Sequence, residues 1–252
     1  MEGVKQLAAR SSESARSADP LVRDGLVQLD LSSMTVREIN DYLHHRAKLA
    51  GSKKVQILGP AGQHNLAVGL DCDLDVEILG HAGYFIGGMN KRANITVHGN
   101  VGWSVAENIM SGTVRVQGFA SECAAASGHG GLVVIEGDAS SRCGISMKGV
   151  DIVVGGSVGH MSAFMAQAGT LLVCGDAAAA LGDSLYEAVI YVGGKIHSLG
   201  ADAREESMSQ SDYDKVRSLL RQAQIAADPL RFKRIASART LYHWNVEADQ
   251  EY

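Results

Sequence analysis

Aromatic residues and prolines are scarce in this chain of 252 residues. Only 5% of the residues are aromatic, four of them Phe, and there are three prolines. The 29 glycines, by contrast, are abundant. A globular α/β core normally uses more large side chains than this. The composition therefore favours a narrow coil with little interior space, where glycine and other small residues fit.

Cysteines are also few, and they are scattered. There is no Cys-x-x-Cys pair among Cys72, Cys123, Cys143 and Cys174. Zinc and iron–sulfur sites usually need such closely spaced ligands, so we expect reduced thiols in a reducing cytosol. The nine histidines do not form stacked pairs on the repeat described below. We expect neither a metal nor another cofactor in this chain.

Long apolar segments are absent. No run approaches the roughly 18 to 20 apolar residues of a membrane span, and the N-terminus lacks the apolar segment of a secretory signal. The net charge of −5 gives no reason to expect binding to nucleic acid. We therefore expect a soluble cytoplasmic protein that binds neither membranes nor nucleic acid.

What the sequence does contain is a repeat with a fixed period of 19 residues. The repeat is marked by a series of ladder glycines: Gly80, Gly99, Gly118, Gly137, Gly156, Gly175 and Gly194. Positions −4 and −2 relative to each ladder glycine are Val, Ile or Leu in every repeat, as in "VEILG" and "ITVHG". Side chains two apart on a strand share a face, so each repeat has one aliphatic face. Such units must stack on one another to bury that face.

The repeat predicts a parallel β-helix over residues 55–200. It would have about seven to eight rungs, including a looser one that ends at Gly59, stacked at roughly 4.8 Å. Leucine-rich repeats share the period but require a leucine and asparagine pattern that is missing here. The return segments, such as "GFASECAAASGHGG", are rich in Gly, Ala and Ser, which suits a narrow interior and corners with positive φ.

Three further segments flank the repeat. Residues 1–24 are polar, and we expect a loose arm. Residues 25–54 contain an alternating strand and a helix that a Thr35–Glu38 capping box would open, continuing to about Leu49 as a cap over the first rung. Residues 201–252 contain a helix and a tail. Helical spacing relates the apolar residues of that helix, Tyr213, Val216, Leu220, Ala223 and Ala227.

Position −3, which should point outward, changes character along the repeat. Its residues are Glu77, Thr96, Arg115, Val134, Val153, Leu172 and Tyr191. The last four would form an exposed apolar stripe, which soluble proteins usually cover. The cover could be the C-terminal helix or a partner chain. We favour the helix because it is always nearby, and we expect partners to use the polar face or the ends of the ladder.

One local pattern suggests an enzyme. "GGSVG" at 155–159 has the Gly-x-Ser-x-Gly form of a nucleophile elbow, followed by His160, with Asp138 and Asp176 on the adjacent rungs. However, an elbow requires a strand, a sharp turn and a helix, whereas another coil follows here. Ser157 is simply the residue after a ladder glycine. We favour an ordinary repeat position, and a hydrolase using Ser157, His160 and Asp176 stays open as an alternative.

The repeat also carries a resemblance to a known family. "GHAGYFIG", with Gly80, Gly83 and Gly87, resembles the Gly-x-x-Gly-x-x-x-Gly signature of the GXGXG family. This family includes the right-handed β-helix of the glutamate synthase large subunit and the corresponding β-helix subunit of formylmethanofuran dehydrogenase. The flanks "LDLSSMTVREINDYLHH" and "FKRIASARTLYHW" are most similar to the small β-helix subunit of N-methylglutamate synthase (methylamine–glutamate N-methyltransferase). Later rungs depart from the glycine pattern at Ser121, Ser140, Ala178 and His197.

The resemblance implies a non-catalytic structural subunit of a hetero-oligomer, with no catalytic, cofactor-binding or metal-binding residues of its own. Its partners would be a class-II amidotransferase-like subunit and an FMN-binding glutamate-synthase-like subunit, and the partners of some such enzymes also hold iron–sulfur clusters. The reaction of the complex would convert glutamate and methylamine into N-methylglutamate and ammonia. A structural subunit of a formyl-transfer complex like formylmethanofuran dehydrogenase is the other alternative.

Overall fold

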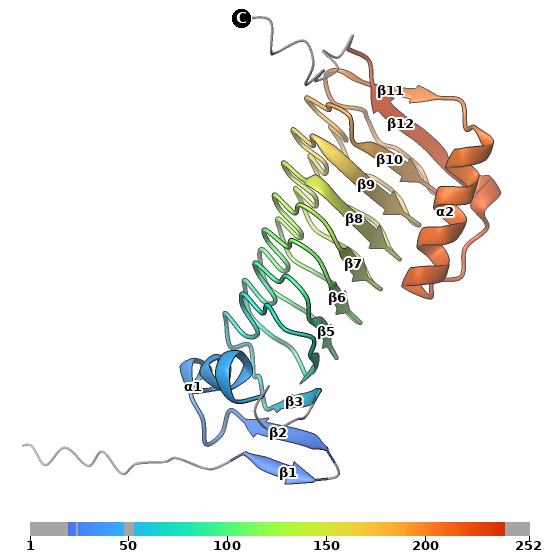
Figure 1. The fold of residues 1–252 in the computed structure, drawn as a ribbon. Helices are drawn as coiled ribbons and strands as arrows, with labels where there is room; N and C mark the ends of the chain where they lie inside the picture. Colours follow the sequence, from blue (N-terminus) through green and yellow to red (C-terminus); the bar gives the residue numbers. More distant parts are fainter. Residues whose placement is uncertain (1–19, 24, 48–52, 240–252) are drawn as a thin grey trace, which may run out of the picture.

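The aliphatic columns of the repeat lie on the strands of one long sheet, which winds as a coil (Figure 1). The computed structural model describes residues 20–23, 25–47 and 53–239. Neighbouring strands pair in parallel from β2 (Leu26–Asp30) through β10 (Val189–Val192). One antiparallel strand is added at the N-terminal end of the sheet and two at the C-terminal end. The molecule is thus a parallel β-solenoid with two α-helices, and the fold class predicted from the repeat is confirmed.

The elements follow the chain in order. The N-terminal part contains β1 (Leu21–Arg23), β2 (Leu26–Asp30), α1 (Val36–Asp41) and a π-helical turn (Tyr42–Arg46). The repeat contains β3 (Lys54–Leu58), β4 (Asp75–Leu79), β5 (Asn94–Val97), β6 (Thr113–Val116), β7 (Leu132–Ile135), β8 (Lys148–Val154), β9 (Ala168–Val173) and β10 (Val189–Val192). The C-terminal part contains β11 (Ala203–Glu206), α2 (Gln210–Ala223), a 3₁₀ turn (Pro229–Arg231) and β12 (Lys233–Ser237).

Strand register keeps each column of the repeat straight. Val76 pairs with Ile95, Ile95 with Val114, and the same step of 19 residues continues along the stack. The −4 and −2 columns are buried throughout, so the interior is a continuous aliphatic core. The residue two positions after each ladder glycine also points inward, and isolated bridges join these residues on successive rungs, for example Val101 and Ala120. Each rung therefore contributes side chains to the core from two sides of the coil.

The return segments use positive φ more widely than glycine alone would suggest. In successive rungs the residues five, seven and nine after the ladder glycine adopt it, as Ser104, Ala106 and Asn108 do with φ of 59°, 56° and 55°. Position +7 is Ala or Gly in each of these rungs, because it faces the narrow interior. We expected glycine to supply the positive φ at the corners of the coil. Glycine does so at some corner positions, and Ala, Ser, Asn and other residues do so at the rest.

Gly83 and Gly102 are needed for space rather than for positive φ. A Cβ added at Gly102 would lie 2.8 Å from the carbonyl carbon of Gly83 on the preceding rung. At Gly83 it would lie 2.4 Å from the Gly62 carbonyl oxygen. Both distances are too short for real contacts, so the close stacking of rungs excludes side chains at these two positions.

The N-terminal segment joins the ladder more closely than expected. β2 pairs in parallel with β3, so it is a further strand of the stack rather than part of a separate cap. β1 then pairs antiparallel with β2, although Leu21–Arg23 falls within the segment expected to be a loose arm. Residues 1–19, the rest of that arm, lie outside the described residues.

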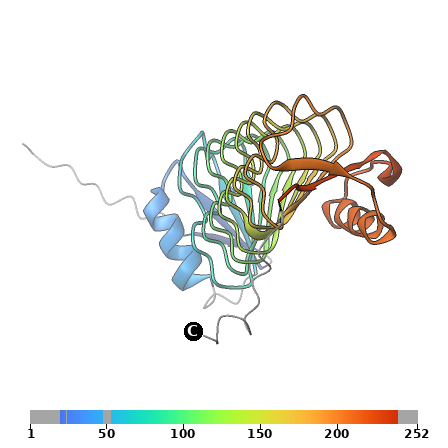
Figure 2. The same cartoon turned by 90° about the horizontal axis from the view of Figure 1, so that it is seen from above.

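The first helix begins as predicted but is short. Both hydrogen bonds of the Thr35–Glu38 capping box are present. The α-helix changes to a π-helical turn at Tyr42. Ile39, Tyr42 and Leu43 are buried in the core, and Arg46 lies over the Tyr42 ring at 5.2 Å. Figure 2 shows that α1 and α2 lie on different sides of the coil. Leu49, the expected end of the helix, lies outside the described residues.

The C-terminal helix covers the apolar stripe, as predicted. Val134, Val153, Leu172 and Tyr191 are buried in one cluster with α2 residues and Phe232. Leu219 joins Val216 and Leu220 at this contact, whereas Tyr213 is only partly buried and is not among its members. Ala227 lies beyond α2, because Gln224 takes the left-handed conformation that ends the helix.

The segments before and after α2 also form sheet, which the sequence did not indicate. β12 pairs antiparallel with β10, and β11 pairs with β12. Residues that we expected to form a tail therefore close the last rung of the ladder. Residues 240–252 lie outside the described part of the chain.

Candidate functional surfaces

The side chain after most of the ladder glycines binds the next rung. Most of these +1 side chains accept a hydrogen bond from the backbone N–H of the +1 residue 19 positions later. The accepting atoms and distances are His81 Nδ1 at 3.0 Å, Asn100 Oδ1 at 3.1 Å, Asp138 Oδ1 at 2.7 Å, Ser157 Oγ at 3.0 Å and Asp176 Oδ1 at 2.7 Å. We call this series the +1 ladder. It satisfies backbone donors along one edge of the solenoid.

The +1 ladder gives Ser157 and Asp176 a structural task. Ser157, His160 and Asp176 do line one hollow of about 730 Å³. However, Ser157 Oγ accepts from the Asp176 N–H at 3.0 Å, and His160 Nδ1 donates to the Ala179 carbonyl oxygen at 3.1 Å. In the described part of the chain no hydrogen bond joins Ser157 to His160. The arrangement that activates a serine nucleophile requires that bond.

The cysteines are placed for packing. The four of them, all within the described residues, form no disulfide with one another. Burial raises the pKa of the Cys143 thiol to about 12 and that of Cys174 to about 11. Such thiols stay protonated near neutral pH and are poor nucleophiles and metal ligands. Within residues 20–23, 25–47 and 53–239, no three His, Cys, Asp or Glu side chains are grouped to hold a metal ion.

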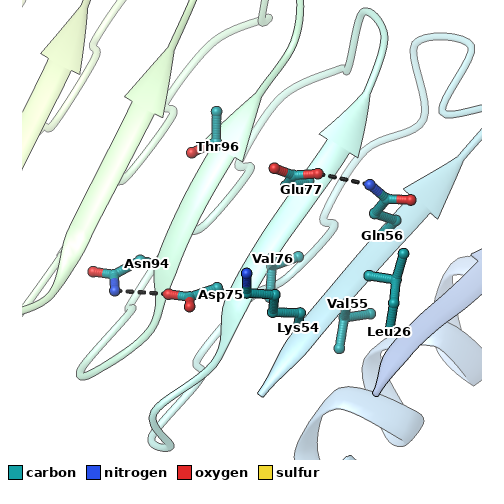
Figure 3. A pocket seen from close by; sticks show the side chains of 9 residues that line it. All are labelled: Leu26, Lys54, Val55, Gln56, Asp75, Val76, Glu77, Asn94 and Thr96. Carbon is teal, nitrogen blue, oxygen red and sulfur yellow. Dashed lines mark hydrogen bonds between the residues drawn. The ribbon is translucent and has the colours of Figure 1, made fainter. Parts of the chain in front are cut away.

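The half of the sheet that α2 leaves uncovered is polar. Over β3, β4 and β5 a hollow of about 500 Å³ is lined by two rows of side chains (Figure 3). In one row Gln56 Nε2 donates to Glu77 Oε2 at 2.8 Å, and in the other Asn94 Nδ2 donates to Asp75 Oδ1 at 2.9 Å. The row of Gln56 continues to Gln28 on β2. This face needs no apolar cover, in contrast to the stripe under α2.

Arg115 marks the boundary between the two halves. Its guanidinium donates to Glu136 Oε1 at 2.8 Å and to the Ala223 carbonyl oxygen at the C-terminal end of α2, also at 2.8 Å. A cation at this end of a helix is favourable because the last carbonyls carry partial negative charge. The change from polar to apolar residues at position −3 therefore coincides with the end of the covering helix.

The other end of α2 is held by a polar cluster. Tyr191 Oη donates to Asp212 Oδ1 at 2.6 Å, and Arg234 Nε donates to the same oxygen at 3.2 Å. Burial, followed by the hydrogen bond to Asp212, raises the pKa of Tyr191. Burial opposes ionisation of Asp212, but hydrogen bonds from Ser209 and Tyr191 and the charge of Arg234 outweigh it and hold its pKa below 3.8. The cluster fixes α2 in register on the sheet.

A group of exposed aromatic side chains lies on the first rungs, and we did not identify it from the sequence. We call it the aromatic patch: His64, Tyr84, Trp103 and Phe119. The His64 and Tyr84 rings stack with centroids 3.8 Å apart, and the Trp103 side chain is 62% exposed. The signal was present in the repeat, because Tyr84 and Trp103 both occupy position +4 on adjacent rungs.

No helix in the described part of the chain is both long and apolar enough to cross a membrane.

Comparison with known proteins gives one informative relative. The chain is 48% identical over 225 residues to Protein GlxC of Rhizobium meliloti (strain 1021). The aligned region covers 89% of this chain and 99% of the relative. No protein-family model matches the chain. No solved structure matches it significantly either. Near-complete coverage at this identity, together with the β-solenoid fold, shows that the chain belongs to the GlxC family.

Proposed function

We propose that this chain is a non-catalytic structural subunit of a multi-chain glutamate-synthase-like enzyme, most closely an N-methylglutamate synthase. The complex would convert glutamate and methylamine into N-methylglutamate and ammonia. A class-II amidotransferase-like subunit and an FMN-binding subunit would perform the chemistry. FMN and any iron–sulfur cluster would be bound by those partners, and this chain would brace them against each other.

The observation that carries this proposal is the +1 ladder. The polar residues that could suggest catalysis, Ser157 and Asp176, use their side chains to bind backbone N–H groups of the adjacent rungs. The same position is filled by His81, Asn100 and Asp138 in earlier rungs, with the same kind of bond. A series of equivalent hydrogen bonds is what a scaffold requires, whereas a catalytic centre requires one distinct constellation.

Rigidity supports the bracing role. The rungs share a continuous aliphatic interior, and α2 binds four successive rungs through Val134, Val153, Leu172 and Tyr191. Each rung contacts its neighbours directly, so a partner that binds at one end is held in a fixed relation to one at the other. Membership of the GlxC family and the resemblance of the flanks to N-methylglutamate synthase support the choice of complex.

A mass-spectrometric inventory of the native complex tests the proposal. We expect the tagged chain to co-purify with an amidotransferase-like chain and a flavin-containing chain in fixed stoichiometry. Formyltransferase or metal-dependent amidohydrolase partners would instead indicate a formyl-transfer complex like formylmethanofuran dehydrogenase. Hydrolase activity in the isolated chain, lost on Ser157→Ala, would contradict the structural role.

A further inference from the structure

We infer that the aromatic patch is the docking site for a protein partner of this chain, and that the partner presents arginine or lysine side chains to it. The inference rests on the proposed function, because the partner is one of the chains of that complex. The proposed function requires only that partners exist, whereas the inference assigns a surface and the chemistry that recognises it.

The first observation is that Phe119 interrupts the +1 ladder. Every other +1 side chain from position 81 to position 176 accepts the N–H of the next rung. Phe119 has no acceptor, and within the described residues no side chain accepts from the N–H of Asp138. The Phe119 side chain is also 52% exposed, so burial of the ring does not compensate for the lost hydrogen bond. A residue that departs from the hydrogen-bonding pattern of its position, without stabilising the fold in another way, indicates a functional position.

The second observation is that exposed aromatic side chains also lie on the rungs that precede the rung of Phe119. The loops stack in register, since the Phe85 N–H donates to the Trp103 carbonyl oxygen at 2.8 Å. This stacking places Tyr84 and Trp103 at equivalent positions of two successive rungs, and His64 stacks on Tyr84. Exposed Trp and Tyr side chains held on a rigid backbone are typical of the residues that dominate the energy of protein interfaces.

The third observation concerns charge. Glu122 follows Trp103 at position +4, with the Ser104 N–H donating to the Glu122 carbonyl oxygen at 2.9 Å. Asp138 follows Phe119 at position +1 and is exposed. A carboxylate thus follows both the aromatic pair Tyr84 and Trp103 at position +4 and the single aromatic residue Phe119 at position +1. Aromatic faces attract cations, and carboxylates pair with them, so a surface carrying arginine or lysine complements this arrangement.

The patch also lacks a cover within the described chain. α2 covers only the C-terminal part of the sheet face, where the stripe from Val134 to Tyr191 lies. In later rungs the +4 position is occupied by Ser141, His160 and Ala179, which are small or polar. Tyr84, Trp103 and Phe119 thus lie on three successive rungs, and among the described residues Tyr186 is the one further exposed Tyr, Trp or Phe.

Phe119→Asn is the informative substitution. Asparagine restores the acceptor that Asn100 provides one rung earlier, so we expect the isolated chain to melt at the wild-type temperature or higher. Binding to the partner chain should nevertheless weaken at least about tenfold, as for loss of an interface aromatic. Trp103→Ala should weaken binding similarly. Tyr186→Ala removes a tyrosine on a distant rung that is 43% exposed and serves as the control, with unchanged binding.

The charge requirement is tested with Glu122→Gln and Asp138→Asn together. Asp138→Asn keeps an oxygen for the Ser157 N–H, so the +1 ladder stays intact. We expect weaker binding and a shallower dependence of the dissociation constant on salt, because fewer ion pairs are screened.

The experiment measures dissociation constants of the full-length chain with the purified amidotransferase-like chain and the purified FMN-binding chain, at two salt concentrations. Melting temperature and molar mass of the isolated variants are measured in parallel. Wild-type binding that Phe119→Asn and Trp103→Ala leave unchanged would overturn the docking site and leave the proposed function standing. Failure of the wild type to bind either chain would overturn both. Loss of self-association in Phe119→Asn, or a marked drop in its melting temperature, would assign the patch to a second copy or to internal packing and overturn the inference.

Discussion

Each residue of a rung faces its equivalent on the next rung about 4.8 Å away, and this spacing decides which side chains fit. From Gly99 to Gly194 the ladder glycines leave no room for any side chain, since a Cβ at Gly99, for example, would lie 2.8 Å from the Gly80 carbonyl carbon. At the +1 position a short acceptor is favoured, which explains the run of His, Asn, Asp and Ser. The glycines were recognisable from the sequence by their period. The reason for the +1 residues was not, because a hydrogen bond between rungs leaves no pattern except polarity.

A substitution at Gly102 tests the space requirement. Gly102→Val should lower the free energy of unfolding by on the order of 3 kcal/mol, because Cβ would meet the Gly83 carbonyl carbon at 2.8 Å. Ser121→Val, at the equivalent position of the next rung, should cost much less, since that rung already accommodates a Cβ. Denaturant unfolding of both variants provides the comparison. Equal losses would show that the two rungs do not share this geometry.

Among the helices and strands, those with a periodic sequence pattern could be predicted from the sequence. The strands β4 to β10 repeat every 19 residues, with β3 set 21 residues before β4, and the capping box and helical spacing marked α1 and α2. The strands β11 and β12 lie outside the repeat and pair antiparallel, so no spacing identified them. β2 was recognised as a strand, but its parallel pairing with β3 depends on tertiary contact rather than on local sequence. Helix α2 was assigned to the apolar stripe because four outward positions were apolar.

The contact of α2 with the stripe is tested by introducing charge. Val153→Glu buries a carboxylate under α2 and should lower the free energy of unfolding of the isolated chain by about 3 kcal/mol or more. Leu172→Glu should behave alike. Thr96→Glu serves as the control, because it lies in the same outward column on the uncovered half of the sheet, and should change stability little. If both buried variants melt like the wild type but fail to assemble with partners, a partner chain covers the stripe instead of α2.

The polar cluster at the start of α2 should show itself in the dependence of stability on pH. The folded state raises the pKa of Tyr191, so the contribution of its protonated hydroxyl is complete below 10.0 and is lost as the pH rises above that value. Tyr191→Phe removes the hydrogen bond to Asp212 and should cost about 1 to 2 kcal/mol near neutral pH.

Between about pH 9 and about pH 11 the wild type should then lose more stability than Tyr191→Phe, because only the wild type has this hydroxyl to ionise. Asp212 acts in the opposite direction: its lowered pKa stabilises the fold above 3.8, and that contribution is lost in acid. Parallel alkaline curves for the two proteins would show that the Tyr191 hydroxyl is not held by Asp212 in solution.

At the scale of the molecule, the two ends of the solenoid differ. The C-terminal half covers its apolar stripe with α2 and closes its last rung with β12, whereas the N-terminal half exposes a polar sheet face and the aromatic patch. A scaffold that joins two partners needs distinct surfaces of this kind on one rigid body. The sequence allowed the covered stripe to be predicted, but the aromatic patch became evident only when residues 16 to 20 positions apart were seen on adjacent rungs.

Reconstitution of the complex decides whether this chain supports catalysis without performing it. The rate of N-methylglutamate formation from glutamate and methylamine is measured with the two partner chains alone, with the wild-type chain added, and with Ser157→Ala added. We expect the wild-type chain to be required, the Ser157→Ala complex to retain activity within a few-fold, and this chain alone to be inactive. A loss of several orders of magnitude with Ser157→Ala in a fully assembled complex would show instead that this chain takes part in the chemistry.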